Sequence, residues 1–305
     1  MEELPELELW TPLAYHPLFD DEVYEDSDET NLSGGAITVA HEVRKLSIVS
    51  DNRAFNRLYE LVGHRELNER TWSAGLGSAR IHHRLSEFRS REDQLRTPRV
   101  DLLAAGETVA RPERTSTLLL DNGPLPGLLV GREHVEPGGD RVAEPMSFRH
   151  KNRISLVDLQ DMLVAIARPD LAPEGVRLGL SEDSLEFLRA AMTQLPAESA
   201  NPVYSAERYP DDWVKFLLPG LARVVAPRDL RVTNKVGRAY GFCVENAYVR
   251  DVARDRGFFL SAVLYVNPNG VLNDGEYGYA DLADPFFADL GEAVVAHLWG
   301  SGGVQ

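Results

Sequence analysis

Two short runs of this 305-residue sequence combine residue types that can bind and activate a polar substrate. Ser50-Asp51-Asn52 offers a hydroxyl that both donates and accepts hydrogen bonds, a carboxylate and an amide. Lys235-Val236-Gly237 offers an ammonium group and, two residues later, a position without a side chain. A lysine in a weakly screened cleft attracts a carboxylate, and a serine hydroxyl can pass a proton to a leaving nitrogen. The two runs therefore contain the residue types that anion binding and proton transfer require.

Apolar residues recur at helical spacing on either side of the first run. They are Val39, Val43 and Leu46 before it, and Phe55, Leu58, Tyr59 and Val62 after it. We therefore expect Ser50 at a joint between two helices. Within that joint, Asp51 is expected to bond backbone amides and fix the loop rather than touch a substrate.

The second run falls in a region with strand character. Residues 230–235, 240–249 and 258–266 are typical of strands, and the last is apolar on both faces, as a central strand should be. Cys243, the only cysteine, is expected inside a strand as a small buried residue, and no intramolecular disulfide is possible. A closing helix is expected to follow, with one apolar face formed by Phe287, Leu290, Val294 and Leu298.

These motifs make the sequence resemble the penicillin-recognising serine hydrolases of the class A β-lactamase and D,D-peptidase kind. The stretch from Ser50 to Leu58 follows the family's extended Ser-Asp-Asn pattern, including a second asparagine, Asn56. Asn234-Lys235-Val236-Gly237 is similar to the family's Lys-Thr-Gly strand, the first of three that lead to a C-terminal helix. The resemblance implies an α/β (α+β) fold: a helical lobe and an antiparallel sheet flanked by a C-terminal helix, with the family's N-terminal strands missing.

The resemblance also implies a role for each residue of the two runs. Ser50 and Lys235 would be catalytic, Ser50 as a proton relay and Lys235 as the positive charge for a substrate carboxylate. The substrate-binding set would be Asn52, Val236, Gly237 and Arg238, the last through its backbone N–H, with Asp51 and Asn56 as structural support. Gly237 would let a substrate lie close along the strand. Val236 replaces the family's Thr or Ser, and the lost hydroxyl should weaken carboxylate binding by about 1 kcal/mol.

Two departures from the family pattern concern the reaction itself. No Ser-x-x-Lys nucleophile motif occurs, because the residues three before the four lysines are Glu42, Phe148, Asp212 and Val232. The expected deacylating acid falls at or near Leu85, and Glu87 is the nearest carboxylate. The resemblance thus implies a serine hydrolase that acts on β-lactams or related amides through an acyl-enzyme. It also implies that the chain is truncated at its N-terminus and that the nucleophile lies outside this sequence. A slow, D,D-peptidase-like acyl-enzyme is the favoured variant. The alternative is a non-catalytic ligand-binding or interaction homologue that keeps the cleft.

The charge and hydrophobicity of the sequence limit the classes of partner that the protein can bind. A formal net charge of −16 opposes nucleic-acid binding, and no run of about 18 apolar residues is present that would span a membrane. The scattered histidines and the absence of cysteine clusters give no metal site, and no cofactor is expected. The expected partner is a small molecule or peptide with a carboxylate, together with self-association through an uncovered sheet edge. The acidic start lacks the features of a secretory signal, although full-length family members are periplasmic or secreted.

The pattern of helices, strands and turns predicts three parts. Residues 1–35 form an irregular acidic lead-in, and residues 36–220 a mainly helical lobe. An arm of turns and short strands is inserted in this lobe at about 87–150, where turn residues replace long apolar runs. Residues 221–305 form the antiparallel sheet and the closing helix.

Overall fold

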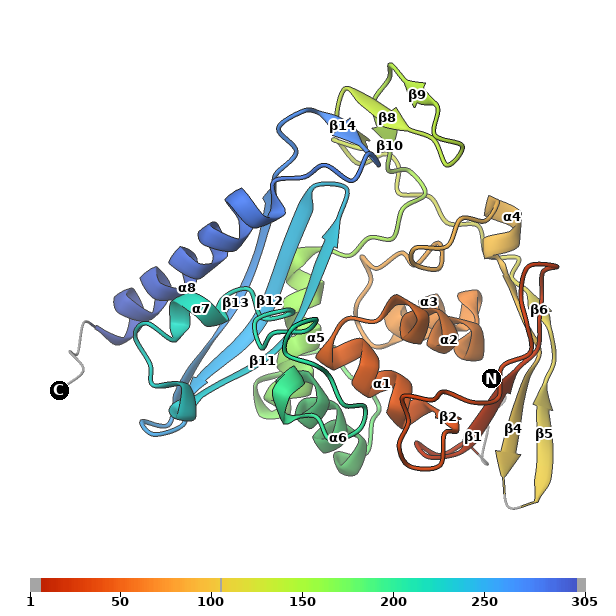
Figure 1. The fold of residues 1–305 in the computed structure, drawn as a ribbon, viewed down its shortest axis with the longest axis horizontal. Helices are drawn as coiled ribbons and strands as arrows, with labels where there is room; N and C mark the ends of the chain where they lie inside the picture. Colours follow the sequence, from red (N-terminus) through yellow and green to blue (C-terminus); the bar gives the residue numbers. More distant parts are fainter. Residues whose placement is uncertain (1–6, 105, 301–305) are drawn as a thin grey trace.

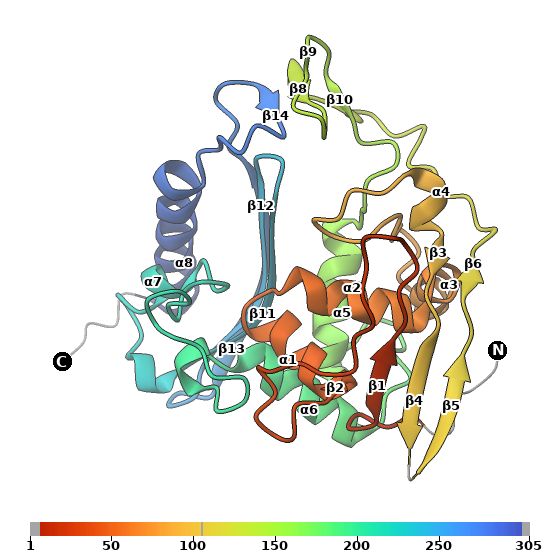
Figure 2. The ribbon, with the colours of Figure 1, turned by 45° about the vertical axis from the view of Figure 1, so that its right-hand side comes forward.

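A computed structural model describes residues 7–104 and 106–300 of the chain. A group of helices and a long three-stranded antiparallel sheet lie side by side, and a C-terminal helix covers the far face of the sheet (Figure 1). Seen along the plane of the sheet, the C-terminal helix lies on one side and the helical group on the other (Figure 2). The expected mixture of helices and antiparallel sheet with a closing helix is confirmed.

The helical group begins with the pair that flanks Ser50. Its helices are α1 (Val39–Ile48), α2 (Asn52–Val62), α3 (His64–Ser73), α5 (Leu156–Ala167) and α6 (Glu182–Thr193). Side-chain oxygens of Thr38, Asp51, Ser155 and Ser181 accept backbone N–H groups at the starts of α1, α2, α5 and α6. The two helices predicted around the Ser-Asp-Asn run are therefore present.

The long sheet consists of β11 (Leu230–Ala239), β12 (Phe242–Asp251) and β13 (Arg256–Tyr265), hydrogen-bonded in that order. The apolar pattern of the last strand is typical of a central strand, but β12 is central. Within the described residues β13 is paired on one side only, so it forms the uncovered sheet edge that the absence of the family's N-terminal strands predicts. β13 is apolar on both faces because one face meets α8 (Asp284–Trp299) and the other meets α5. The hydrophobic pattern of a strand indicates which of its faces are buried, whereas its place in a sheet depends on the backbone hydrogen bonds along its edges.

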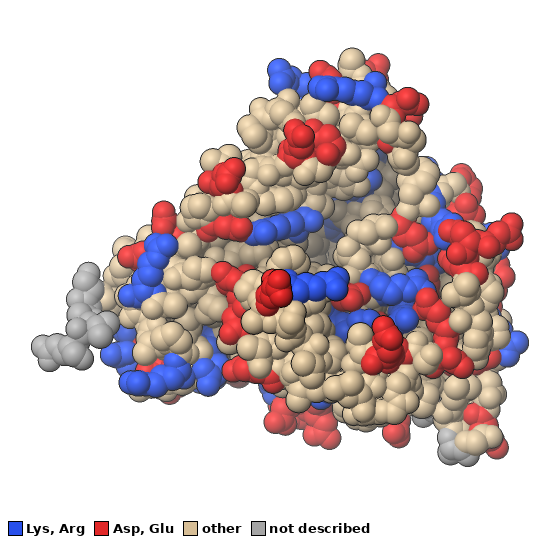
Figure 3. Space-filling view, in the orientation of Figure 1, with Lys and Arg blue, Asp and Glu red and all other residues tan. Residues whose placement is uncertain are grey.

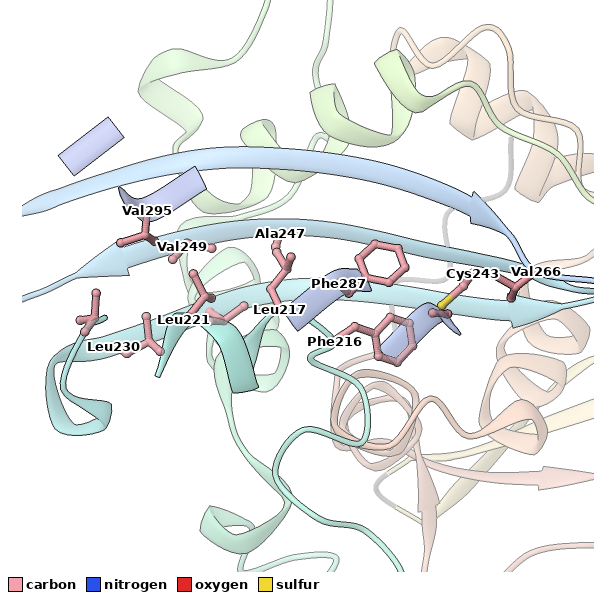
Figure 4. Close-up of a cluster of buried hydrophobic side chains, with 13 residues drawn as sticks. Phe216, Leu217, Leu221, Leu230, Cys243, Ala247, Val249, Val266, Phe287 and Val295 are labelled. Carbon is pink, nitrogen blue, oxygen red and sulfur yellow. The ribbon is translucent and has the colours of Figure 1, made fainter. Parts of the chain in front are cut away.

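The largest apolar core lies between this sheet and the helices on its outer face (Figure 4). Phe287 of α8 and Leu221 of the short helix α7 (Leu218–Leu221) are fully buried against β12, where Cys243 is also buried, as predicted. A π-helical turn, η4 (Tyr279–Ala283), leads into α8. Short 3₁₀ turns complete the connections: η1 (Pro169–Leu171), η2 (Pro196–Glu198) and η3 (Pro227–Asp229).

A second, smaller sheet lies on the outer side of α1 and α2, and it overturns the expectation of a wholly irregular start. β1 (Pro12–Tyr15) pairs with β2 (Ile37–Thr38) and with β4 (Val100–Ala104), which continues into β5 (Glu107–Arg111). Leu13 and Tyr15 are buried there. Four residues are too few for a period to be recognised, and the partner strand that buries them is more than 80 residues away. The part of the lead-in before Leu7 lies outside the described residues.

The segment between Arg84 and Lys151 contains mostly short strands and turns. Besides β4 and β5, its elements are α4 (Arg91–Gln94), β3 (Arg96–Thr97), β6 (Arg114–Thr115), β7 (Leu129–Val130), β8 (Glu133–Val135), β9 (Arg141–Val142) and β10 (Met146–Ser147). The backbones of Arg80 and Arg153 bond each other at its base, and its far end pairs β8 with β14 (Val271–Leu272). The division of the chain into three parts stays a prediction. Among the described residues, no helix has the length and apolar content to cross a membrane.

We propose that the open edge of β13 causes the isolated chain to self-associate. Edge strands offer backbone groups to other chains, and Val263 on this strand is 46% exposed. Val263→Lys should therefore shift the protein toward monomer in size-exclusion chromatography with light scattering. Val252→Lys, at an exposed position in the β12–β13 turn, is the matched control and should leave the distribution unchanged. A wild-type chain that is monomeric at micromolar concentration would contradict the proposal.

Candidate active site

The joint between α1 and α2 holds Ser50 in an uncommon backbone conformation. Its φ is +57°, in the left-handed region that costs a residue with a Cβ roughly 1–2 kcal/mol. Asp51 begins α2 by accepting the Ala54 amide at 2.9 Å. Strain of this kind persists where the surrounding structure fixes it, and it gathers at functional sites. The two helices thus hold the Ser50 hydroxyl in a fixed position.

Lys235 of β11 reaches across to this joint. Its Nζ donates to Ser50 Oγ at 2.6 Å and to the Val236 carbonyl at 2.9 Å. The first bond joins the helical group to the sheet between residues 185 positions apart. Burial lowers the pKa of the Lys235 ammonium to about 8, although the Glu245 carboxylate acts in the opposite direction. The two residues with predicted catalytic roles are therefore in direct contact, and the lysine loses its charge as the pH rises through about 8.

The two asparagines of the motif both form hydrogen bonds with the segment from Leu85 to Glu87. Asn52 Nδ2 donates to Ser86 Oγ at 2.7 Å. The buried Asn56 side chain accepts the Leu85 amide at 2.7 Å and donates to the Leu85 carbonyl at 3.0 Å and to Glu87 at 3.3 Å. Leu85 thus occupies the position that Asn56 fixes, and it brings no carboxylate there. Glu87 is also held by Arg89 at 2.9 Å.

The residues after Lys235 differ in what they offer the site. A Cβ placed on Gly237 would meet no atom within 4 Å, so the space beside β11 is open there. The Val236 side chain packs against the core on the other face of the sheet. The Arg238 guanidinium pairs with Asp284 and lies 4.0 Å from the centre of the Phe216 ring. The side chains of Val236 and Arg238 are therefore not brought to the Ser50–Lys235 pair, whereas Gly237 leaves room beside it.

A buried polar network that the sequence motifs did not reveal supports β11 behind this pair. Lys215 Nζ donates to Asn234 Oδ1 at 2.8 Å and to the backbone carbonyls of Met192 and Val232. Asn234 Nδ2 donates to Glu245 at 2.7 Å. Burial lowers the pKa of Lys215 to about 8 and raises that of Glu245 to about 7. The network fixes the residue next to Lys235. Its one signal in the sequence is a lysine inside the apolar run from Trp213 to Leu218.

A second buried network fixes the helices below Ser50. Lys45 of α1 and Arg57 of α2 each donate to Asp28 at 2.8 Å, and Arg57 also bonds Glu42 at 3.1 Å. Burial lowers the pKa of the neighbouring His41 to about 4. Asp28, His41 and Glu42 lie close enough together to hold a metal ion, but the cationic groups of Lys45 and Arg57 already neutralise the carboxylates. The cluster is suited to bracing α1 against α2.

The surface is hollowed where the long sheet, the helical group and the arm meet (Figure 3). Comparison with models of known protein families supports the assignment of the first motif run. Residues 20–120, which include Ser50 to Asn56, match the model of the β-lactamase enzyme family. This third of the chain is β-lactamase-like. The β-lactamase-like stretch contains the first motif run and the segment that Asn56 holds, while Lys235 lies outside it. No curated protein matches the sequence.

Three of the solved structures to which the chain is similar are β-lactamases. The enzyme from Streptosporangium roseum has 14% sequence identity and a TM-score of 0.44, and the likeness covers 90% of this chain and 71% of that one. The enzyme from Burkholderia vietnamiensis has 14% identity and a TM-score of 0.44, and the likeness covers 90% of this chain and 73% of that one. The enzyme from Sphaerobacter thermophilus DSM 20745 has 13% identity and a TM-score of 0.41, and the likeness covers 87% of this chain and 64% of that one.

Proposed function

We propose that this chain carries the substrate-binding and proton-relay part of a serine hydrolase site that acts on β-lactams or related amides. The hydrogen bond between Lys235 and Ser50 carries the proposal, because it joins the two motif runs at one place. The β-lactamase-like stretch supports the substrate class. The nucleophile would come from a segment outside these 305 residues, since no Ser-x-x-Lys occurs among them.

The contacts suggest how the pair works. The Lys235 ammonium donates to Ser50 Oγ, so the Ser50 hydroxyl keeps its own proton for a leaving nitrogen. The same ammonium would attract the substrate carboxylate, and the open space at Gly237 would admit the substrate along β11. Asn52, exposed at the start of α2, would hold the substrate's amide side chain. This machinery assists the attack of a nucleophile and supplies none.

Deacylation is the step that these residues support least. Asn56 fixes Leu85 where the family resemblance expects a carboxylic acid, and Glu87 is held by Asn56 and Arg89. Without a positioned carboxylate to activate water, an acyl-enzyme would persist. A slow, D,D-peptidase-like enzyme is therefore the favoured variant. A non-catalytic homologue that binds the same ligands is the second candidate, and the missing Ser-x-x-Lys favours it.

Covalent labelling tests the assignment of Ser50. Incubated with a fluorescent penicillin and run on a denaturing gel, this chain should give no labelled band, because Ser50 is placed as a relay. Adding an upstream coding segment that contains an in-frame Ser-x-x-Lys should produce a band, and replacing the serine of that motif should remove it. A band from the present chain that disappears in Ser50→Ala would show that Ser50 is itself the nucleophile. A full-length protein that binds penicillin without labelling would favour the binding homologue.

Non-covalent binding should depend on pH through Lys235. The folded-state pKa of about 8 leaves the ammonium charged below that pH and neutral above it. The penicillin carboxylate stays ionised throughout, so its attraction is present at pH 6.5 and lost as pH rises through about 8. Isothermal titration with benzylpenicillin should show about a 10-fold or greater loss of affinity by pH 9.5, the scale of one charge-assisted bond. Lys235→Met should bind weakly with no such pH dependence. A wild-type affinity that is independent of pH would contradict this role for Lys235.

A further inference from the structure

A cavity of about 440 Å³ lies at the end of the long sheet where β12 turns into β13. Gly237, beside the candidate active site, lies toward the other end of β11. The residues that line the cavity include three arginines and one carboxylate, Arg168, Arg250, Arg256 and Asp255, together with Tyr248 and Phe259. In a chain of net charge −16, three arginines around one cavity are an unusual concentration of positive charge. Lys and Arg side chains also gather on the surface at this end of the sheet, at the lower left of Figure 3.

Arg250 is the least satisfied of these arginines. It lies directly opposite Arg231 in the pairing of β11 with β12, and like charges at such positions repel. Its ion pair with Asp255 spans 3.8 Å, and Asp255 is 97% exposed. Within the described residues, the Arg250 side chain makes no hydrogen bond. A guanidinium held beside a like charge, with its donors free, is suited to an incoming anion.

The other two arginines are held in place by carboxylates. Arg168 pairs with Asp170 at 2.6 Å, and Arg256 pairs with the buried Asp251 at 3.1 Å. Arg254 shares Asp251 at 3.0 Å. Counting Arg231 and the Arg228–Asp229 ion pair, six arginines thus stand against four aspartates at this end of the sheet. The carboxylates orient two of the guanidinium groups and leave a local excess of positive charge.

The aromatic wall of the cavity depends on a glycine. Tyr248 and Phe259 stack with their ring centres 4.3 Å apart and their planes at 17°. A Cβ on Gly257 would lie 3.0 Å from the Tyr248 ring and 2.9 Å from the Val249 carbonyl oxygen. Only glycine therefore lets the Tyr248 ring lie so close to the β12–β13 turn. The cavity thus combines guanidinium groups with a flat apolar surface.

We propose that this cavity binds a small phosphate ester that carries an aromatic ring. Phosphate oxygens match the fork of donors on a guanidinium group, so Arg250 would bind the phosphate with Arg168 and Arg256 beside it. The ring would pack on Phe259. The volume exceeds the needs of a bare phosphate and is within the range of small-molecule sites. The proposal is independent of the Ser50–Lys235 site.

Isothermal titration of the full chain with phenyl phosphate and with inorganic phosphate tests it. Phenyl phosphate should bind saturably, and at least about 10-fold more tightly than inorganic phosphate. Arg250→Gln should weaken both ligands at least about 10-fold. Arg65→Gln is the matched control: Arg65 and Arg250 side chains are both 44% exposed, and Arg65 lies on α3. This variant should bind like the wild type.

Phe259→Ala separates the ring contact from the phosphate contact. It should remove the preference for phenyl phosphate and leave the affinity for inorganic phosphate unchanged. Thermal melting of each variant shows whether it is folded. Arg250→Gln changes a half-exposed side chain, so its melting temperature should equal that of the wild type. The proposal is overturned if phenyl phosphate does not saturate the wild-type chain, or if folded Arg250→Gln binds it as well as the wild type does. Equal loss in Arg65→Gln would also overturn it, because the attraction would then be non-specific.

Discussion

Replacing Gly237 with valine should abolish ligand binding at the candidate active site and leave the fold intact. A Cβ at this position meets no atom within 4 Å, so the valine side chain would extend into open space. Its φ lies outside the left-handed region, and valine favours the strand conformation that β11 already has. The added branches would fill the space that the proposed substrate needs. We expect the affinity for benzylpenicillin to fall at least about 100-fold, a cost of about 3 kcal/mol.

Two measurements on the same samples separate the effect on binding from an effect on folding. Isothermal titration gives the affinity for benzylpenicillin, and thermal melting should give a midpoint equal to or slightly above that of the wild type. Gly138→Val is the matched control, because a Cβ there also meets nothing within 4 Å and the residue lies in the arm. The control should bind like the wild type. If Gly237→Val bound benzylpenicillin normally, the ligand would not lie along this part of β11.

The two helices that flank Ser50, and the joint between them, could be predicted from the sequence because their apolar residues repeat at helical spacing over eight positions each. β1 could not, because it is four residues long and its neighbours β2 and β4 come from distant parts of the chain. The apolar pattern of β13 alone did not indicate that this strand lies at an edge. Its apolar residues face α5 on one side and α8 on the other, so its sequence pattern equals that of a central strand.

The contact between Ser50 and Lys235 follows from two motif runs whose roles are linked in the family resemblance. What the motifs could not predict is the direction of neighbouring side chains. Arg238 pairs with Asp284, which lies 46 positions further along the chain. Lys215 reaches Asn234 and the Val232 carbonyl because the segment around Lys215 runs beside β11. A short sequence motif does not indicate which distant segments of the chain lie beside it in the fold.

The Lys215 network makes the strand that carries Lys235 sensitive to a substitution far from any ligand. The Lys215 ammonium is fully buried and donates to three acceptors, and the Glu245 carboxylate is equally buried. Asn234 lies between them and bonds both. Removing one charge from such a network leaves the other uncompensated in a medium that solvates it poorly. The three acceptors of Lys215 would also lose their donor.

We therefore expect Lys215→Met to reduce the free energy of unfolding by about 3–5 kcal/mol. Urea unfolding followed by circular dichroism measures the loss, with an unchanged slope showing that the transition stays two-state. Lys151→Met is the matched control, because Lys151 donates to the Tyr240 hydroxyl at a half-buried position, and it should cost about 1 kcal/mol. Adding Glu245→Gln to Lys215→Met should cost less than the sum of the single changes, since the uncompensated carboxylate is then gone. Strict additivity, or a loss no larger than that of Lys151→Met, would show that Lys215 does not stabilise β11 through its charge.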